Sequence, residues 1–237
     1  MRRGGAGRVR PVEAEATSSP SGVLVAGYAA PVSRGLFVSF EGGDGAGKST
    51  QVRALVTWLA GRGRGVVATF EPGATSLGAV LRGAVQHGED VGARAEALLY
   101  AADRAHHVAS VVRPALERGD DVVTDRYLDS SVAYQGVGRG LGADVVDRLS
   151  RWATDGLMPD LTVLLDVDPQ VGLGRLTGEP DRLERAGTAF HRQVRAAFVA
   201  RAQADPGRFL VLDATRPPDD LAAAVRDRVE TLLTTRR

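Results

Sequence analysis

The sequence predicts an α/β fold, in which a doubly wound, five-stranded parallel sheet carries helices on both faces and so forms three layers. Two observations support this prediction. Short apolar stretches alternate along the chain with longer stretches that have helical periodicity. A glycine-rich turn also joins the first apolar stretch to the first helical one. Such a strand–turn–helix unit is typical of the first repeat of a parallel α/β sheet.

Five short apolar segments are the expected strands, and they cover residues 36–41, 66–70, 121–125, 161–167 and 208–213. Helical spacing of apolar residues fills the intervals and predicts helices over residues 48–59, 76–85, 93–117, 144–154, 188–204 and 218–233. Gly119 follows the third of these helices, at a position where glycine commonly ends a helix. Because the strands are apolar throughout and separated by helices, we expect both faces of the sheet to be covered.

Composition limits the remaining possibilities for the 237-residue chain. Residues 35–237 suit one domain, whereas residues 1–34 are rich in Arg, Gly, Ala, Ser and Pro and are predicted to be a disordered N-terminal extension, with an overlong gene start or a signal peptide as alternatives. A net charge of +1 argues against a nucleic-acid-binding protein. No apolar run approaches the ~20 residues of a membrane span. Cysteine is absent, which favours the cytoplasm.

The glycine-rich turn contains the only lysine of the chain, Lys48. The sequence also has no asparagine and no isoleucine, so its codons are inferred to be rich in G and C, a background in which a retained lysine is significant. The turn satisfies the pattern G-x-x-x-x-G-K-[ST] and lies between a strand and a helix, which predicts a P-loop NTPase fold. A chance glycine turn is the alternative. A GTPase is excluded because its guanine-reading Asn-Lys-x-Asp motif needs asparagine.

This motif predicts the binding site for ATP. Glycines let successive backbone N–H groups surround the phosphates, and Lys48 is expected to hold the β- and γ-phosphates. The Ser49 hydroxyl is expected to ligate Mg²⁺. The predicted ATP-binding residues are Gly42, Gly43, Asp44, Gly45, Ala46, Gly47, Lys48, Ser49 and Thr50.

Further motifs, in the same order along the chain, resemble those of thymidylate kinases. They are Phe40-Glu41 leading into the phosphate loop, Glu71-Pro72-Gly73-Ala74-Thr75, the run from Glu96 to Arg104, Asp125-Arg126-Tyr127 continuing through residues 130–136, and Asp181-Arg182-Leu183-Glu184 followed by Phe190-His191. The resemblance covers residues 36–234. It implies Mg²⁺-dependent transfer of the γ-phosphoryl group of ATP to dTMP, in a homodimer.

The end of the third predicted strand carries two candidate catalytic residues. Asp125 is placed where a carboxylate reaches Mg²⁺ or its water shell, although it would also serve as a helix N-cap. Arg126 is expected where the donor and acceptor phosphates meet, because its planar guanidinium bridges oxyanions, and a surface ion pair is its alternative. Lys48, Asp125, Arg126 and Arg182 are therefore the catalytic candidates, and Ser49 and Asp125 are the metal candidates.

The resemblance also implies a binding site for dTMP. Tyr100 would stack on thymine and Arg104 would hydrogen-bond its edge, whereas from the residues alone Tyr100 would more often belong to the core and Arg104 to the solvated surface. Asp44 would accept a hydrogen bond from the sugar 3′-hydroxyl. The complete implied set is Asp44, Glu71, Arg82, Tyr100, Arg104, Arg126, Ser130, Ser131, Tyr134 and Gln135. Ordinary turn polarity is the alternative for Ser131 and Gln135.

Residues 174–187 are polar and interrupted by a proline, and they are predicted to form a short lid. Arg175, Arg182 and Arg185 are its candidates for stabilising the transferring phosphoryl group, with plain solvation as the alternative. Two features depart from the family: Phe70 stands where an arginine is common, and the lid is short. Another nucleotide or nucleoside kinase, or a catalytically silent nucleotide-binding protein, therefore stays an alternative. His106, His107 and Trp152 are expected to be packing or surface residues.

Overall fold

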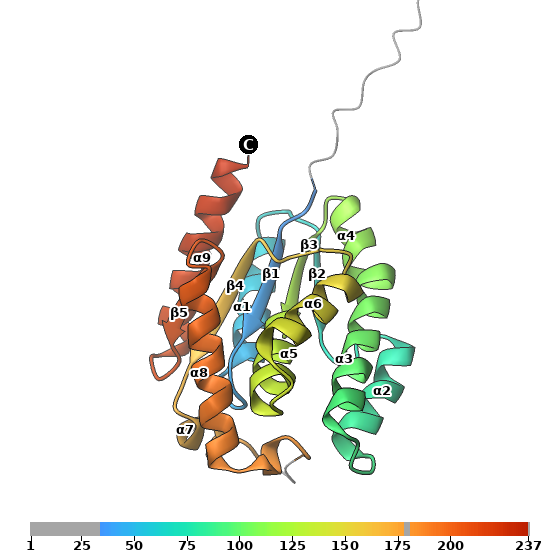
Figure 1. Cartoon of the computed structure of the whole chain (residues 1–237). Coiled ribbons are helices and arrows are strands. Elements are labelled where there is room, and N and C mark those ends of the chain that lie inside the picture. The colour runs from blue at the N-terminus through green and yellow to red at the C-terminus, as the bar shows by residue number, and fades with distance from the viewer. Residues whose placement is uncertain (1–33, 178–180, 237) are drawn as a thin grey trace, which may run out of the picture. The chain divides into compact units, whose positions relative to one another are not determined.

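The computed structural model describes residues 34–177 and 181–236. Five parallel strands form one sheet in the order β2-β3-β1-β4-β5, with bounds β1 Phe37–Glu41, β2 Val66–Phe70, β3 Asp121–Asp125, β4 Leu161–Asp166 and β5 Phe209–Asp213 (Figure 1). The predicted α/β fold and its five strands are confirmed. The predicted N-terminal extension lies outside the described residues except for Arg34.

Helices occupy every interval between strands, as the periodicity predicted. The α-helices are α1 Lys48–Ala60, α2 Ser76–His87, α3 Ala93–His107, α4 Arg113–Glu117, α5 Leu128–Ser131, α6 Ala143–Ala153, α7 Pro169–Leu173, α8 Thr188–Ala204 and α9 Pro218–Thr235. Helices α1 and α9 pack on one face of the sheet, while α4, α5 and α8 lie on the other. The three expected layers are therefore present.

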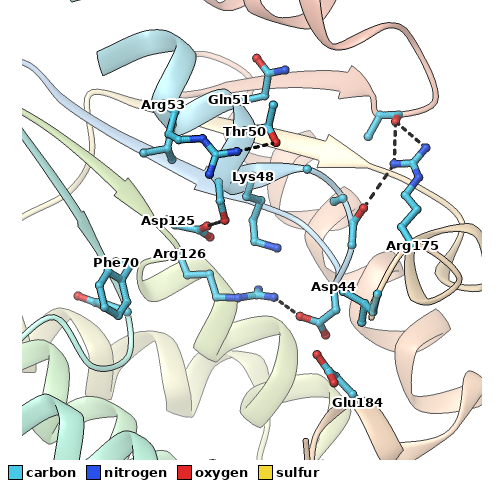
Figure 2. A pocket seen from close by; sticks show the side chains of 18 of the residues that line it. Asp44, Lys48, Thr50, Gln51, Arg53, Phe70, Asp125, Arg126, Arg175 and Glu184 are labelled. Carbon is cyan, nitrogen blue, oxygen red and sulfur yellow. Dashed lines mark hydrogen bonds and ion pairs between the residues drawn. The ribbon is translucent and has the colours of Figure 1, made fainter. Parts of the chain in front are cut away.

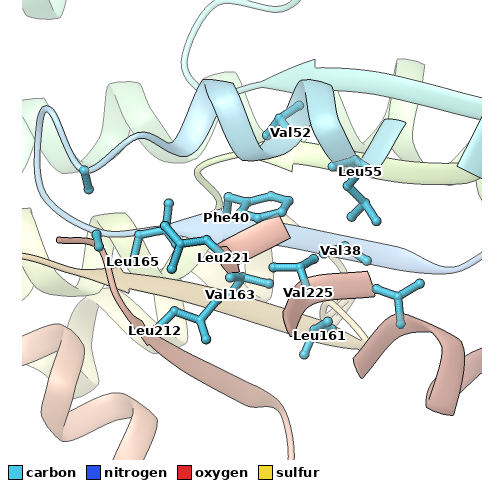
Figure 3. Close-up of a cluster of buried hydrophobic side chains, with 14 of the residues drawn as sticks. Val38, Phe40, Val52, Leu55, Leu161, Val163, Leu165, Leu212, Leu221 and Val225 are labelled. Carbon is cyan, nitrogen blue, oxygen red and sulfur yellow. The ribbon is translucent and has the colours of Figure 1, made fainter. Parts of the chain in front are cut away.

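The side chains of β1 point alternately to the two faces of the sheet. Val38 and Phe40 point into the core beneath α1 and α9, together with Val163 and Leu165 of β4 (Figure 3). Period-two alternation sends the intervening side chains to the opposite face. The buried Glu41 at the end of β1 therefore faces α5 rather than the apolar core.

The predicted helix over residues 93–117 is one helical run with a local irregularity. A wider, π-helical turn at Val108–Val112 separates α3 from α4. Pro114 follows directly, and its ring would collide with the carbonyl group four residues earlier in a regular α-helix. The wider turn relieves this collision, since the backbone N–H of Arg113 pairs with the carbonyl of Val108, five residues back.

Three helical segments were absent from the prediction. Residues 128–138, expected as a loop after Asp125-Arg126-Tyr127, form α5 and a π-helical turn at Val132–Gly138. The short α7 and a 3₁₀ turn at Glu184–Ala186 were also missed. Each is short and lies beside the glycine-rich turn or the lid, where glycines and polar residues hide a helical period. Within the described ranges, the helices all lack the length and apolar character that crossing a membrane requires.

Candidate active site

The glycine-rich turn after β1 lies at the carboxyl end of the sheet, at the point where strand order reverses on either side of β1. Gly45 has a φ of 70°, and a side chain there would collide with the carbonyl oxygen of Gly172 in α7. Gly47 has a φ of 92° and immediately precedes α1. The turn thus needs glycine both for its left-handed backbone and for its contact with α7.

Lys48 opens α1 and is almost completely buried. Its Nζ donates hydrogen bonds to the carbonyl oxygens of Gly42, at 3.2 Å, and Gly43, at 2.9 Å. Burial, reinforced by the positive charge of Arg126, lowers the pKa of Lys48 to about 8, although nearby carboxylates oppose this shift. The single lysine is therefore held at the phosphate loop, as predicted, with an ammonium group that burial destabilises.

The two candidate metal ligands lie together beside the loop. Ser49 Oγ donates a hydrogen bond of 2.7 Å to Asp125 Oδ2 (Figure 2). Asp125 is not the N-cap of α5, which Tyr127 occupies. Hydroxyl and carboxylate oxygens suit Mg²⁺. Among the described residues there is no cluster of three or more acidic or histidine side chains able to enclose a metal, so an ion here would also need oxygens from a nucleotide and water.

Arg126 extends from the end of β3 toward the loop (Figure 2). Its Nη2 pairs with Asp44 Oδ1 at 2.5 Å, and its Nη1 donates to the carbonyl of Gly42 at 3.1 Å. Tyr134 completes the group by donating to Asp44 Oδ2 at 2.9 Å. Burial opposes ionisation of Asp44, but Arg126 and Lys48 lower its pKa. This ion pair lies inside the site, so Arg126 does not form the surface ion pair that was its alternative.

The backbone of Arg126 is strained. Its φ of 69° is left-handed, a conformation that costs a non-glycine residue roughly 1–2 kcal/mol. Hydrogen bonds on both sides hold it: its N–H donates to Phe40 O at 2.9 Å, and its carbonyl accepts from Thr124 Oγ1 at 2.9 Å. Strain maintained in this way is typical of a functional position, because it aims the guanidinium across the end of the sheet.

Glu41 is a site residue that the sequence prediction missed. Its Oε1 accepts from the backbone N–H of Tyr127 at 2.8 Å, and its Oε2 accepts from Ser130 Oγ at 2.5 Å. Burial, followed by the nearby Asp129, raises the pKa of Glu41 to about 7. The sequence feature that could have identified Glu41 is its position as an acidic residue at the end of an apolar strand. The carboxyl group holds the chain between Arg126 and Ser130 in place.

A small, partly open cavity of about 50 Å³ lies next to the Arg126–Asp44 pair. Nine of the ten residues predicted to bind dTMP line it, and Arg82 is the exception. The nine are Asp44, Glu71, Tyr100, Arg104, Arg126, Ser130, Ser131, Tyr134 and Gln135. Ser131 and Gln135 lie in the helical segment after β3 rather than in an ordinary turn. Residues from four separate motifs therefore converge on one cavity.

Arg104 is fully buried on the wall of this cavity, which rules out the alternative of a solvated arginine. Its Nε donates to Glu71 Oε2 at 2.7 Å and its Nη2 donates to Ser131 Oγ at 3.0 Å. His107 contacts the other carboxylate oxygen of Glu71 at 2.9 Å and reaches Thr69 at 2.6 Å with its second ring nitrogen. The guanidinium is thus aimed by a buried ion pair, and His107 packs behind it.

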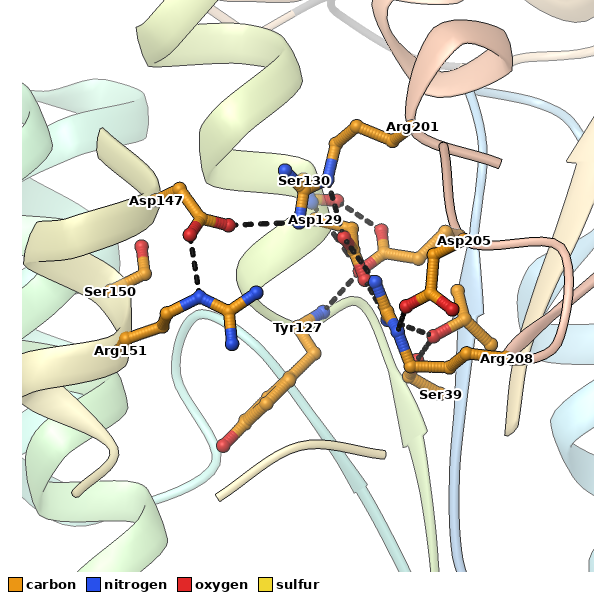
Figure 4. A network of polar contacts seen from close by, with 12 residues as sticks. Ser39, Tyr127, Asp129, Ser130, Asp147, Ser150, Arg151, Arg201, Asp205 and Arg208 are labelled. Atoms are coloured by element: carbon orange, nitrogen blue, oxygen red, sulfur yellow. Dashed lines mark hydrogen bonds and ion pairs between the residues drawn. The ribbon is translucent and has the colours of Figure 1, made fainter. Parts of the chain in front are cut away.

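A second buried ion-pair network contacts the same segment through Asp129 (Figure 4). Asp129 of α5 is completely buried and pairs with Arg201 of α8, at 2.5 Å, and with Arg208 next to β5, at 2.7 Å. Burial opposes ionisation of Asp129, but the two arginines lower its pKa. The network attaches α5 to α8 and β5, and so fixes the segment that carries Ser130 and Ser131.

Arg82 of α2 does not line this small cavity, but it shares a larger cleft with Asp44, Glu71 and Arg126. This open cleft has a volume of about 1400 Å³ and contains the phosphate loop. The Nη1 of Arg82 donates to the carbonyl of Pro72 at 2.9 Å, and its guanidinium lies 5.9 Å from the ring of Phe70. Phe70, the residue that stands where arginine is common, is half exposed on this cleft and supports Arg82.

The predicted lid divides into two parts, and residues 178–180 lie outside the described residues. Arg175 reaches the phosphate loop, where it donates to the carbonyls of Gly45, at 3.4 Å, and Ala214, at 3.2 Å. Arg182 does not. It donates to the carbonyl of Val85 at 3.0 Å and pairs with Glu96 at 2.7 Å, and it lines neither cavity. The buried Glu96 holds Arg182 outside both cavities in this arrangement, and the catalytic role of Arg182 stays a prediction.

A parallel sheet with a phosphate loop at its switch point, beside a small cavity lined by Arg104 and Arg126, defines a phosphotransferase of the P-loop class with a donor and an acceptor side. The family model of thymidylate kinase matches residues 40–225. The chain is 59% identical to a thymidylate kinase of Leifsonia xyli over 200 residues, which cover 83% of this chain and 95% of that protein. It is 51% identical to a thymidylate kinase of Deinococcus radiodurans over 197 residues, 82% and 96% of the two chains. The chain belongs to the thymidylate kinase family.

Proposed function

We propose that the protein transfers the γ-phosphoryl group of ATP to dTMP and so forms dTDP and ADP. The observation that carries this proposal is the placement of Arg126 between the phosphate loop and the small cavity, paired with Asp44 at 2.5 Å and 3.1 Å from the carbonyl of Gly42. One guanidinium borders both sides, so phosphates bound on each side would meet beside it. This is the arrangement that phosphoryl transfer between two nucleotides requires.

On the donor side, the phosphate loop and Lys48 would bind the triphosphate of ATP. Mg²⁺ would be held by the Ser49 hydroxyl and the Asp125 carboxylate, which lie 2.7 Å apart, and it would neutralise charge on the phosphates. Arg175, whose guanidinium lies against Gly45, would close the donor side as part of the lid at residues 174–187. No general base is needed because the acceptor phosphate is already an anion.

On the acceptor side, the small cavity would take the thymine base and the deoxyribose. Tyr100 is buried on its wall and offers an aromatic face, while Arg104 offers guanidinium donors held by Glu71. Asp44 and Tyr134, joined by a hydrogen bond of 2.9 Å, would meet the sugar. Tyr134 would crowd the 2′ carbon of that sugar, which would favour a deoxyribose over a ribose.

We further propose that the protein acts as a homodimer in the cytoplasm, where its nucleotide substrates occur. Large apolar side chains are exposed on α2, α3 and α6, and they are Leu77, Val80, Leu98, Val145 and Trp152. Helix α3 packs against both α2 and α6, so these exposed side chains lie on adjacent helices. Exposed apolar groups of this kind favour association with a second copy. Equilibrium sedimentation of the wild type and of Val80→Glu tests this, and a wild-type monomer would contradict it.

The activity is tested by following dTDP and ADP directly during incubation of the purified full chain with ATP, Mg²⁺ and dTMP. We expect equal amounts of both products and a requirement for Mg²⁺. CMP and thymidine serve as competing acceptor classes in parallel reactions. Faster turnover of either would identify a different nucleotide or nucleoside kinase, and binding of both nucleotides without products would identify a catalytically silent protein.

A further inference from the structure

Glu96, in the first turn of α3, is a completely buried carboxylate that accepts from three donors, two from the helical turn after α5 and one from the lid. Gln135 Nε2 donates to its Oε1 at 2.9 Å. Arg139 pairs with its Oε2 at 3.2 Å, and Arg182 at the end of the lid pairs with the same oxygen at 2.7 Å. These three partners hold the Glu96 carboxylate in one well-defined position.

This position determines how the Gln135 side chain is turned. A glutamine amide has a donor nitrogen and an acceptor oxygen of almost equal size, so either orientation fits the same space. An ion-paired carboxylate only accepts hydrogen bonds, and therefore Nε2 must face Glu96. The acceptor Oε1 then occupies the other arm of the amide. Within residues 34–177 and 181–236, Oε1 has no hydrogen-bond partner, although Gln135 is buried and lines the small cavity.

Pyrimidine bases differ in what they offer to such an acceptor. Thymine and uracil carry a hydrogen on N3 and donate there, whereas N3 of cytosine has a lone pair and accepts. An amide oxygen facing the base would therefore pair with thymine and oppose cytosine. The opposite amide orientation would reverse this preference.

We propose that Glu96 is a specificity-determining positioning residue, which fixes the Gln135 amide so that the cavity accepts bases with an N3–H donor. This inference rests on the proposed acceptor, dTMP. Turning the amide over would place Gln135 Oε1 against the Glu96 carboxylate, which loses one buried hydrogen bond and opposes two acceptors. Arg139 and Arg182 keep Glu96 from rotating away to relieve that contact.

The test compares three acceptors, dTMP, dUMP and dCMP, in the wild type and in Glu96→Gln. A glutamine at position 96 both donates and accepts, so the Gln135 amide is released. We expect the ratio of kcat/KM for dTMP over dCMP to fall roughly tenfold, corresponding to one buried hydrogen bond. The ratio for dTMP over dUMP should stay unchanged, because the two bases share the same N3–H edge. An equal loss for all three acceptors, or an unchanged dTMP to dCMP ratio, would overturn the proposal.

Two further measurements keep the test decisive. Arg139→Met is the matched control, since it removes one ion pair from Glu96 and leaves the Gln135 contact in place, and its dTMP to dCMP ratio should match that of the wild type. The wild type with N3-methyl-dTMP needs no variant to fold, and its turnover should fall at least about tenfold. Equal turnover of dTMP and its N3-methyl form would refute recognition at N3. A wild type inactive on dTMP would instead refute the proposed function.

Discussion

The donor and acceptor sides of this molecule are built by different means. The donor side contains the phosphate loop, which is shaped by glycine backbone and by its contact with α7, and it opens into a cleft of about 1400 Å³ that also reaches Glu71, Arg82 and Arg126. The acceptor side contains a narrow cavity of about 50 Å³ whose walls are charged and polar side chains joined to one another. A typical ligand pocket has roughly 300–1000 Å³. The cavity beside Arg104 is therefore smaller than a bound base and sugar require, and we expect it to widen when dTMP binds.

Because of this difference, substitutions in the two regions should affect stability and activity differently. Side chains on the donor side form few contacts: Lys48 Nζ donates to the carbonyls of Gly42 and Gly43, and Ser49 Oγ donates to Asp125. Side chains on the acceptor side hold one another through buried ion pairs, such as Arg104 with Glu71. Breaking a buried pair leaves an uncompensated charge. Substitutions should therefore cost activity alone on the donor side, and both activity and stability on the acceptor side.

The largest effect is expected on the donor side from Lys48→Ala. Loss of the ammonium group that would meet the β- and γ-phosphates should lower kcat/KM about a thousandfold. The free energy of unfolding should change by less than about 1 kcal/mol, because burial already disfavours the charged lysine. Initial rates and urea unfolding check the two parts. Unchanged activity would refute the role of the phosphate loop.

On the acceptor side, Arg104→Ala should reduce both the catalytic activity and the free energy of unfolding. It strands the buried Glu71 carboxylate, so the free energy of unfolding should fall by about 3–5 kcal/mol, and the KM for dTMP should rise. Arg151→Ala is the matched control, since that arginine forms a surface pair with Asp147 and should cost less than about 1 kcal/mol. If both variants lost the same free energy of unfolding, the buried pair on the acceptor side would be no more important for stability than a surface pair.

Glu41→Gln adds a pH signature to the acceptor side. Because the folded-state pKa of Glu41 is raised to about 7 from 4.5, the folded protein keeps a proton that the unfolded chain loses. Its stabilising contribution is therefore complete below about pH 4.5 and declines as the pH rises toward 7. We expect the wild type to lose on the order of 2 kcal/mol relative to Glu41→Gln across that interval. Parallel pH dependences of unfolding in the two proteins would contradict this.

The smallest effect is expected from Phe70→Arg, which restores the residue common in the family. The KM for dTMP should change less than about threefold, because Arg82 and Arg126 already supply guanidinium groups and the new side chain is solvated. Steady-state kinetics with dTMP measures this. A large gain in kcat would show that the missing arginine limits the wild type.

Sequence reasoning was most successful where a local pattern determines the structure. The motif around Lys48 identified the phosphate loop, and apolar periodicity gave all five strands. It could not foresee that Arg182 pairs with Glu96, which lies 86 positions away. It also gave no role to Glu41, since that role depends on the pairing of β1 with β3, and it could not foresee the left-handed backbone of Arg126. Contacts between distant segments produce these features, and no local pattern records them.

The contrast between an open donor side and a narrow acceptor side is tested most directly by rapid-mixing measurements of nucleotide binding. The observed rate should rise linearly with the concentration of a fluorescent ATP analogue, because its cleft needs no rearrangement. With dTMP, followed by intrinsic protein fluorescence, the observed rate should level off at the rate of cavity opening. A linear dependence for dTMP over the whole concentration range would show that the acceptor side is already open, and would contradict the account.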